Sequence, residues 1–450
     1  MNDYLYNKYN VQTPRYTSFP TIPFWSDGYS SETWQSDLVK SFKEYGDEGV
    51  SLYIHLPYCE HLCTYCGCHK FITTKHVVED PYIAGVLKEW SLYEDLLQEK
   101  VLINEIHLGG GTPTFFSAQN LKVLIEGIIG GHELSSTAEL SIEVHPSYTS
   151  FEQLDTLKKL GFNRISIGVQ DFDPKVQEAI SRVQPFSEVK QLVDWSRSLD
   201  FESVNFDLIY GLPFQTLNSI RNNFEEVLKL KPDRIAYYAY AHVPWTKKAQ
   251  RLYNENDLPK GEEKRALYDL GCQTLLEAGY VEIGMDHFAL PDDKMAIAHK
   301  KNELHRNFMG YTTNKNKILI GLGVSSISDA WSAYSQNEKA LKPYLEKVNN
   351  NLFPTIKGYQ LTDKDLLVKD YILDIICQHK TRFVLEDHHD IMKAILPRLK
   401  EFESDGLLGV FDNGILLSET GKTFVRNICM AFDHHMFGRN PDVQMFSSSV

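Results

Sequence analysis

Short runs of β-branched and aromatic residues alternate with amphipathic stretches along much of the chain. The runs predict six buried strands: Ser51–Pro57, Glu105–Gly109, Glu139–His145, Arg164–Gln170, Ser203–Tyr210 and Arg234–His242. The intervening segments, such as Ala118–Ile129 and Phe151–Leu160, have helical spacing. This alternation favours an α/β fold with a parallel sheet covered by helices, as an incomplete barrel or a doubly wound sheet. In both folds, functional residues collect at the carboxyl ends of the strands.

The segments on either side of these strands have other patterns. Residues 1–47 contain turn signals at Thr13-Pro14 and Phe19-Pro20, and we expect an irregular arm with a short helix. Further along the chain, Tyr280–Leu290 predicts another strand, and Ile318–Ser328 predicts a strand broken by glycine and followed by a loop. We therefore expect the arm to be followed by an α/β region over residues 48–355.

The last part of the chain, residues 356–450, is expected to be a mostly helical domain. Helical patterns cover Thr362–Gln378 and Thr420–Phe432. Between them, Gly406–Phe411 and Gly414–Leu417 predict a hairpin that turns at Asp412-Asn413-Gly414. Helices with a small hairpin indicate a winged-helix-like module, a shape that by itself is poor evidence for DNA binding.

Composition and charge narrow the class of protein. The 450 residues are 42% hydrophobic and 24% charged, which is typical of a globular protein with a sizeable core. The net charge of −14 would repel a phosphate backbone, so we expect no nucleic-acid partner. No stretch approaches the ~18 apolar residues that span a membrane, and the N-terminus lacks signal-peptide features. These features predict a cytoplasmic enzyme with no membrane association.

Four of the seven cysteines lie close together after the first predicted strand. Cys59, Cys63, Cys66 and Cys68 give the spacing Cys-x3-Cys-x2-Cys followed by Cys-x-Cys. A structural zinc site normally uses two separated Cys-x2-Cys pairs, and no second pair is present here. A [4Fe–4S] cluster is held by thiolates, and three close cysteines would leave one iron open to a small molecule. Zinc, or thiols without a metal, are the alternatives on spacing alone.

The other three cysteines give no comparable signal. Cys272, Cys377 and Cys429 are scattered in apolar helical contexts, where cysteine usually acts as a small buried hydrophobic residue. An odd number of cysteines in a long chain without a secretion signal also argues against a disulfide framework.

The cysteine segment carries a resemblance to a known family. Its spacing, with Tyr65 just before Cys66, resembles the cluster motif of radical S-adenosylmethionine (SAM) enzymes. The fuller phrase Tyr53-Ile54-His55-Leu56-Pro57-Tyr58-Cys59, with Cys66-Gly67-Cys68, is similar to oxygen-independent coproporphyrinogen III oxidases. Family-like segments also occur at Pro14–Ser18, Gly109–Thr114, Gly168–Phe172, Asp207–Pro213, Gly284–Ala289, His305–Thr313 and Arg426–Met430. The resemblance covers essentially the whole chain and implies an incomplete (β/α)6 radical SAM barrel.

The resemblance implies two cofactors. Cys59, Cys63 and Cys66 would bind three irons of a [4Fe–4S] cluster, and SAM would chelate the fourth. One electron from the cluster would then cleave SAM to methionine and a 5′-deoxyadenosyl radical. Cys68 and Tyr53 are the candidate catalytic residues, and Cys68 is not counted as an iron ligand.

The family binds two SAM molecules side by side, and the resemblance assigns residues to both. Tyr53, Gly110 and Glu143 would contact the first. The second would be contacted by Tyr65, Gly111, Thr112, Gln170, Arg182, Asp207, Ala241 and Ile327. Carboxylates suit ribose hydroxyls or an ammonium group, and Arg182 could pair with a carboxylate. Each residue taken alone is more readily explained by a cap, a tight turn or a surface ion pair.

The implied reaction converts two propionates of coproporphyrinogen III to vinyl groups, giving protoporphyrinogen IX. A small protein such as flavodoxin or ferredoxin would donate the electron, and the enzyme is expected to be a monomer. The substrate carries four carboxylates, for which Arg15, Tyr16, His305 and Arg306 are candidate anchors.

Three positions depart from the family pattern: Met309 replaces a Gln, His145 an Asp or Asn, and Phe19 a Tyr. Met309 cannot donate a hydrogen bond, which affects any polar contact at the second SAM site.

Related haem chaperones typically have Cys-x-Phe and His-Asn-x-x-Tyr-Trp, whereas this chain has Cys66-Gly67-Cys68 and His305-Arg306-Asn307. Those chaperones, and anaerobic haem-degrading methyltransferases, remain the alternatives within the superfamily. A zinc-stabilised winged-helix regulator is the alternative outside it, and the acidic charge and six strand–helix units argue against it.

Overall fold

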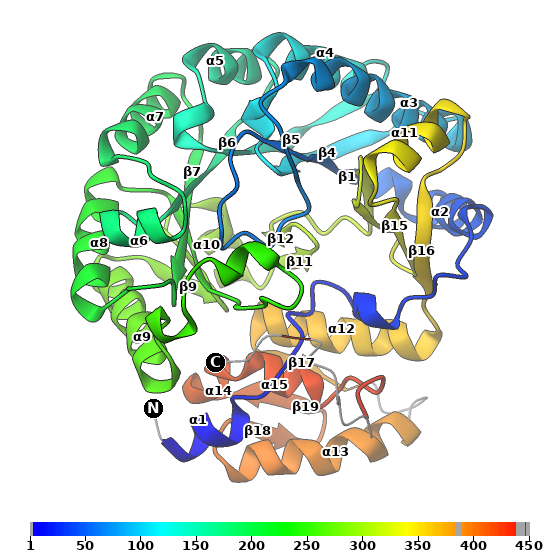
Figure 1. Ribbon diagram of the computed structural model, residues 1–450. Helices are drawn as coiled ribbons and strands as arrows, with labels where there is room; N and C mark the ends of the chain where they lie inside the picture. Colours follow the sequence, from blue (N-terminus) through cyan, green and yellow to red (C-terminus); the bar gives the residue numbers. More distant parts are fainter. Residues whose placement is uncertain (1–2, 384–388, 438–445, 447–450) are drawn as a thin grey trace.

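A curved sheet of parallel strands forms the centre of the molecule in a computed structural model that describes residues 3–383, 389–437 and 446 (Figure 1). Six strands follow one another across the sheet, and each is parallel to the next. They are β1 (Val50–Leu56), β4 (Leu102–Gly110), β5 (Glu133–Val144), β6 (Arg164–Gln170), β7 (Ser203–Tyr210) and β8 (Arg234–Ala239). These are the six strands that the sequence predicts, with ends that differ by a few residues.

Helices cover the outer face of this sheet (Figure 1). Residues on its inner face line a cavity. The covering helices are α3 (Glu79–Leu97), α4 (Ala118–Ile129), α5 (Phe151–Lys159), α7 (Phe186–Ser198), α8 (Leu217–Leu230) and α9 (Gly261–Glu277). Their apolar faces pack against buried strand residues in one large hydrophobic cluster. The short helix α6 (Pro174–Ala179) follows β6. The incomplete α/β barrel is therefore confirmed.

Further strands extend both edges of the sheet. Next to β1 lie β13 (Ile318–Leu322), which is parallel to it, and then the antiparallel β14 (Ile327–Asp329), β15 (Ala333–Asn337) and β16 (Thr355–Gln360). Next to β8 lie β10 (His287–Ala289) and β9 (Val281–Gly284). The two edges do not pair with each other, so the barrel stays open.

The single strand predicted over Tyr280–Leu290 is wrong in one respect. This segment folds back on itself as the antiparallel hairpin β9–β10. Met285 has a φ of 48° at the turn, and Asp286 follows it. The reversal places His287 in the cavity wall.

Shorter elements connect these parts. They are β2 (Tyr58–Cys59), β3 (Phe71–Ile72), α10 (Lys294–Lys301), β11 (His305–Asn307), β12 (Gly310–Thr312) and α11 (Leu341–Asn349). β2 pairs with β3, and β11 pairs with β12 as a small hairpin.

The C-terminal region packs below the barrel as a helical module with a small sheet (Figure 1). It contains α12 (Asp363–Gln378), α13 (His389–Ser404), α14 (Glu419–Thr423) and α15 (Val425–Met430). The predicted hairpin is present as β18 (Leu408–Phe411) and β19 (Gly414–Leu417), and β17 (Lys380–Arg382) adds a third strand. The predicted final helix is broken at Phe424, whose φ of −102° and ψ of 21° end α14. The module is winged-helix-like, as predicted.

The N-terminal arm contains more helix than the sequence analysis predicts. Besides α1 (Asp3–Tyr9) it includes α2 (Ser31–Tyr45), which begins after a Ser30 cap and buries Trp34 and Leu38 against the barrel. α1 instead packs with the C-terminal module, and Leu5 and Tyr9 belong to that module's hydrophobic cluster. The arm therefore contacts both parts of the molecule.

Candidate functional site

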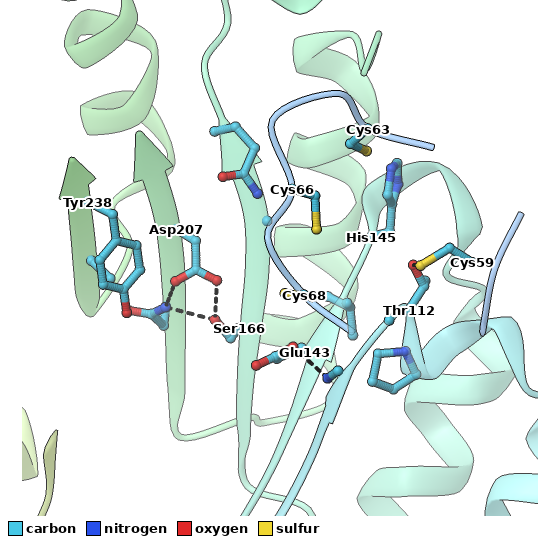
Figure 2. A pocket seen from close by; sticks show the side chains of 18 of the residues that line it. Cys59, Cys63, Cys66, Cys68, Thr112, Glu143, His145, Ser166, Asp207 and Tyr238 are labelled. Carbon is cyan, nitrogen blue, oxygen red and sulfur yellow. Dashed lines mark hydrogen bonds between the residues drawn. The ribbon is translucent and has the colours of Figure 1, made fainter. Parts of the chain in front are cut away.

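A cavity of about 320 Å³ opens at the carboxyl ends of the strands and reaches into the barrel (Figure 2). The cysteine loop after β1 forms one wall, and residues from β4 to β8 form the others. Most of the predicted site residues line it: Cys59, Cys63, Tyr65, Cys66, Cys68, Gly110, Gly111, Thr112, Glu143, Gln170, Arg182 and Asp207. Packing has thus brought together side chains from five separate segments.

The cysteine loop is held in place by contacts with the rest of the barrel. Cys59 and Cys63 are buried, Cys66 is half-buried, and Cys68 is exposed. The Thr112 hydroxyl donates to Cys59 Sγ at 3.3 Å, and Arg182 Nη1 lies 3.7 Å from Cys63 Sγ. Burial raises the pKa of the Cys59 thiol to about 11, whereas a hydrogen bond from Cys68 lowers the pKa of Cys66 to about 5.

The donor set fits a [4Fe–4S] cluster better than a closed zinc site. Cys59, Cys63 and Cys66 all face one cavity, which continues past them into the barrel (Figure 2). A structural zinc site is normally closed by four protein ligands, whereas this arrangement leaves room for a small molecule beside the thiols.

The glycine turn after β4 is required by close packing against the cysteine loop. Gly110 has a φ of 113°, and a Cβ there would lie 2.6 Å from the His55 ring. A Cβ on Gly111 would lie 2.7 Å from the backbone carbon of Pro57. The amide hydrogens of Gly111 and Thr112 are already donated, to Leu56 O and Tyr58 O at 2.9 Å. A ligand at Gly111 would therefore meet the carbonyl groups of the turn rather than free amides.

Two carboxylates, Glu143 on β5 and Asp207 on β7, lie on either side of β6 and differ in their electrostatic surroundings. Burial opposes ionisation of Glu143, but His107 and the Gly110 amide, both 3.2 Å from its oxygens, hold its pKa below the ordinary value. Burial and the nearby charge of Glu143 instead raise the pKa of Asp207 to about 6. Asp207 accepts from Ser166 Oγ and Asn205 Nδ2, each at 3.0 Å (Figure 2). Glu143 is thus the more acidic of the two.

Arg182 presents a half-buried cation to the cavity without a carboxylate partner among the described residues. Its guanidinium donates to Gly168 O at 2.6 Å and to Gln184 Oε1 at 3.2 Å. Both of these partners are uncharged, and the third group within reach is Cys63 Sγ at 3.7 Å, so no carboxylate of the described residues competes with an anionic ligand for this cation. Gln170 lies nearby at the end of β6 with a φ of 66°, next to a bulge in the β6–β7 ladder.

Three predicted site residues do not line the cavity. The Tyr53 hydroxyl shares a hydrogen bond of 3.0 Å with His55 Nδ1. Its ring stacks on His107, which does line the cavity. Ala241 follows β8 and faces a separate hollow beside arm residues 13–18. Ile327 begins β14 and packs with Trp25 and Tyr334. The fold gives these three at most an indirect or backbone contact with a ligand in the main cavity.

Several cavity residues are missing from the sequence prediction. On β6, Arg164, Ser166 and Gly168 line the cavity, as do Asn205 on β7 and Tyr238 on β8. Polar or small residues at every second position of an otherwise apolar strand were the available signal, since alternate side chains share one face. The deeper Arg164 and Arg234 are paired with Glu139, whose pKa they lower to about 2 against the effect of burial. Arg234 also pairs with Asp293 at 2.8 Å, so the two arginines in the cavity wall are balanced by two carboxylates.

The candidate substrate anchors do not line the cavity either. Arg15 pairs with Asp286 at 2.9 Å, and the Tyr16 hydroxyl donates to Asp433 at 3.0 Å. His305 packs near Trp331. Arg306 is buried against the ring of Tyr311, which lines the cavity.

Of the three residues that depart from the family pattern, two lie in the cavity wall and one packs against the C-terminal module. Met309 and His145 line the cavity. His145 accepts from the Ser147 amide through Nδ1, and burial next to Arg182 lowers its pKa to about 2, so the ring is neutral. Phe19 is buried in the cluster of the C-terminal module, and Cys377 and Cys429 are buried there as predicted, whereas Cys272 is only half-buried.

Comparisons with known proteins agree with the cavity. Residues 53–227 match the model of the Radical SAM superfamily. The chain is 38% identical to the oxygen-independent coproporphyrinogen III oxidase of Synechocystis, covering 99% of this chain and 97% of that protein. It is 36% identical to the enzyme of the same name from Escherichia coli K12, covering 99% and 98%.

A solved structure gives the same result. The coproporphyrinogen III oxidase HemN from Escherichia coli, described as a radical SAM enzyme, superposes with a TM-score of 0.89 at 34% identity. The match covers 96% of this chain and 99% of that one. None of the helices in the described residues is long and apolar enough to cross a membrane. Similarity over nearly the full length, with three cysteines at the mouth of the barrel, shows that the chain belongs to the oxygen-independent coproporphyrinogen III oxidase family of radical SAM enzymes.

Proposed function

We propose that this chain converts coproporphyrinogen III to protoporphyrinogen IX without oxygen, as a step of haem biosynthesis. At each of two propionates, a hydrogen atom leaves the β-carbon, carbon dioxide leaves the carboxylate, and one electron passes to an external acceptor. A vinyl group remains. The observation that supports this most strongly is the similarity to enzymes of that name over 99% of the chain.

Family membership implies a [4Fe–4S] cluster and SAM as cofactors. When bound, they supply one-electron cleavage of SAM to a 5′-deoxyadenosyl radical. In this proposal Cys59, Cys63 and Cys66 hold three irons. Their loop is anchored by the Thr64 amide, which donates to Ile180 O at 3.0 Å, and by Thr112 behind Cys59. These contacts keep the thiols at a fixed position at the barrel mouth.

The protein residues in the cavity would orient the first SAM by charge. Glu143 stays ionised at neutral pH because its pKa is low, so it can attract an ammonium or sulfonium group. Gly110 leaves backbone space beside Glu143, which its amide also fixes at 3.2 Å. Tyr53 would contribute indirectly, because it stacks on His107 and shares a hydrogen bond with His55 and so fixes the positions of both rings. Cys68, exposed next to Glu143, is the candidate hydrogen donor or acceptor near the reacting groups.

A second SAM is part of the proposal, and it would occupy the side of the cavity toward β6 and β7. Arg182 is the natural partner for its carboxylate, and Gln170 and Asp207 for its polar groups. Tyr65, Gly111 and Thr112 would contact it from the loop and the glycine turn. Ala241 and Ile327 could contribute only their backbone or an edge contact, given their positions outside the main cavity.

We also propose a small electron-donor protein of the flavodoxin or ferredoxin type, a monomeric enzyme and a cytoplasmic location. The proposed domains are the arm 1–47, the barrel region 48–355 and the C-terminal domain 356–450. A haem chaperone or haem-degrading methyltransferase is not favoured, because the relatives described above are named as oxidases over their full length.

Anaerobic turnover of the iron-reconstituted protein tests the proposal. Coproporphyrinogen III, SAM, a reductant and an electron acceptor are supplied, and the tetrapyrroles and 5′-deoxyadenosine are separated by mass. We expect protoporphyrinogen IX and two 5′-deoxyadenosine per product. If 5′-deoxyadenosine forms while coproporphyrinogen III survives, the radical chemistry stands and the substrate assignment is wrong, with haem as the next compound to test.

A further inference from the structure

Two histidines and an aspartate converge on one point far along the chain from the cysteine loop. Asp365 lies in the first turn of α12, and His434 and His435 follow α15. The Asp365 carboxylate is buried, with 2% of its side chain exposed, whereas the imidazoles are 16% and 20% exposed. The three ligand atoms lie within 4.8 Å of one another. Solvent can therefore reach the edge of the group, while the carboxylate stays fixed inside.

The two carboxylate oxygens of Asp365 have separate tasks. Oδ2 accepts from the Thr362 amide at 3.0 Å, the Thr362 hydroxyl at 2.7 Å and the Tyr359 hydroxyl at 3.2 Å. Among the described residues, Oδ1 contacts the two imidazoles, at 3.1 Å from His434 Nε2 and 2.8 Å from His435 Nε2. One oxygen thus holds the side chain in place and leaves the other directed at the two rings.

The rings are held so that both Nε2 atoms point to Oδ1. Phe24 packs on His435 at 5.4 Å between ring centroids, and Phe19 packs on His434 at 5.6 Å. The two imidazoles lie 4.3 Å apart. The Nδ1 atom of His434 is buried and has no hydrogen-bond partner in the part of the chain that the structure describes, so Nε2 is the atom through which this ring makes its polar contact.

This geometry is close to that of a transition-metal site. Zinc binds imidazole nitrogen and carboxylate oxygen at about 2.0–2.2 Å, which places ligands of a tetrahedral ion about 3.3 Å apart. The two oxygen–nitrogen separations of 3.1 and 2.8 Å need to open by only a few tenths of an ångström, and the two ring nitrogens lie within 4.8 Å of each other. Two nitrogen ligands and one oxygen ligand suit Zn²⁺ better than Ca²⁺ or Mg²⁺, which prefer oxygen alone.

We propose that Asp365, His434 and His435 bind one Zn²⁺ ion, with water in the fourth position. The ion would tie the segment after α15 to the start of α12 and to the arm that carries Phe19 and Phe24. The ion would have a structural role and a site separate from the cysteine loop, since none of its three ligands lines the main cavity. The inference does not rest on the proposed reaction.

Zinc content and zinc K-edge absorption of the cluster-loaded protein test the site. The protein is kept anaerobic, incubated with zinc chloride and desalted, and iron is measured in the same sample. We expect one zinc per chain at unchanged iron content, coordinated only by nitrogen and oxygen at about 2.0–2.1 Å. Failure to retain zinc would overturn the proposal. So would a sulfur shell at about 2.3 Å, which would place the zinc on the cysteines.

Two variants and a matched control separate this site from other histidines. His434→Asn and His435→Asn should each lose the zinc equivalent, while the iron content stays as in the parent. His299→Asn is the control, because His299 neighbours His379 at 6.1 Å between ring centroids without a carboxylate in the pair. It should retain the zinc. Equal zinc content in all three variants would overturn the proposal, and the absorption spectrum of the parent chain decides the matter even if one variant folds poorly.

Discussion

At the scale of single residues, the cavity depends on which ionisable groups have partners. Arg164 and Arg234 are neutralised by Glu139 and Asp293 and stabilise the barrel. Arg182 and Glu143 keep only polar or histidine partners, so their charges remain directed at the cavity. The difference separates structural ion pairs from residues that can hold a charged ligand.

Replacement of Cys63 should remove the cluster and leave the fold. In Cys63→Ala one thiolate of the three is lost, so we expect the iron–sulfur absorption and SAM cleavage to disappear after reconstitution. Cys272→Ala is the control, because Cys272 is a half-buried free cysteine that faces a different hollow. Iron analysis and circular dichroism check both proteins. A cluster retained at parental iron content in Cys63→Ala would contradict the ligand assignment.

Asp207 should give SAM binding a pH dependence. Its pKa is raised to about 6, so in the folded protein the carboxylate is fully ionised only above about pH 6. Because an unfolded aspartate ionises near pH 4, this group lowers the stability of the fold as pH rises from about 4 to about 6. If the carboxylate binds SAM, affinity should rise as pH increases through about 6 and then level off. Asp207→Asn should bind roughly tenfold more weakly at pH 7.5, since a charge-assisted hydrogen bond contributes about 1.5–3 kcal/mol.

Anaerobic titration calorimetry between pH 5 and 8 measures this dependence, with the second equivalent of SAM fitted separately. The profile of Asp207→Asn should lack the inflection near pH 6. An inflection that persists in the variant would assign the titration to another group.

At the scale of elements, the end of β4 and the cysteine loop form one unit. The Gly111 and Thr112 amides donate to the segment just before Cys59, and the Thr112 hydroxyl donates to Cys59 itself. These contacts would transmit any displacement of the turn to Cys59, one of the proposed cluster ligands. The absence of a side chain at Gly110 is what permits this approach.

Gly110→Ala should therefore disturb cluster binding as well as stability. A left-handed φ costs a non-glycine residue about 1–2 kcal/mol, and the added Cβ would also lie 2.6 Å from the His55 ring. Gly131→Ala is a matched control, because Gly131 has a φ of 87° with no atom within 4 Å of the added carbon. Thermal unfolding should show a loss in both proteins, larger in Gly110→Ala. Reduced iron content is expected only in Gly110→Ala. Equal iron content in the two variants would show that the glycine turn does not affect cluster binding.

At the scale of the whole molecule, the arm connects the C-terminal module to the cavity wall (Figure 1). Arg426 donates to Thr13 O and to Pro14 O, and Asn427 donates to Tyr9 O at 2.8 Å. The next arm residue, Arg15, reaches Asp286 and lies over the ring of Tyr238, which lines the cavity. The arm thus supports one side of the cavity from outside.

Arg15→Ala should lower turnover of coproporphyrinogen III several-fold while cluster loading stays intact. The reason is that Asp286 loses its partner and Tyr238 loses the cation above its ring. Lys8→Ala is the control, because Lys8 is an arm cation that pairs with Asp405 and Glu401 in the C-terminal module. Anaerobic kinetics with iron analysis check both variants. Unchanged turnover in Arg15→Ala would show that this contact of the arm does not contribute to catalysis.

The sequence by itself determined the order of strands and helices and the chemistry of the cysteine loop. Both are local properties: apolar runs such as Arg164–Gln170 need only their own side chains to favour a buried strand, and the spacing of Cys59, Cys63 and Cys66 lies within one loop. Local pattern also identified the helix α12. It misjudged α2 and the β9–β10 hairpin, where burial of Trp34 and a left-handed turn at Met285 decided the outcome.

Only the tertiary structure decided which of the polar residues share a site. It placed Tyr53, Ala241 and Ile327 outside the main cavity and brought Ser166, Asn205 and Tyr238 into it. It also joined Asp365 to His435, which is 70 residues away along the chain. Such pairs depend on how twisted strands and packed helices direct their side chains, and those directions are set by contacts among distant segments rather than by the residues themselves.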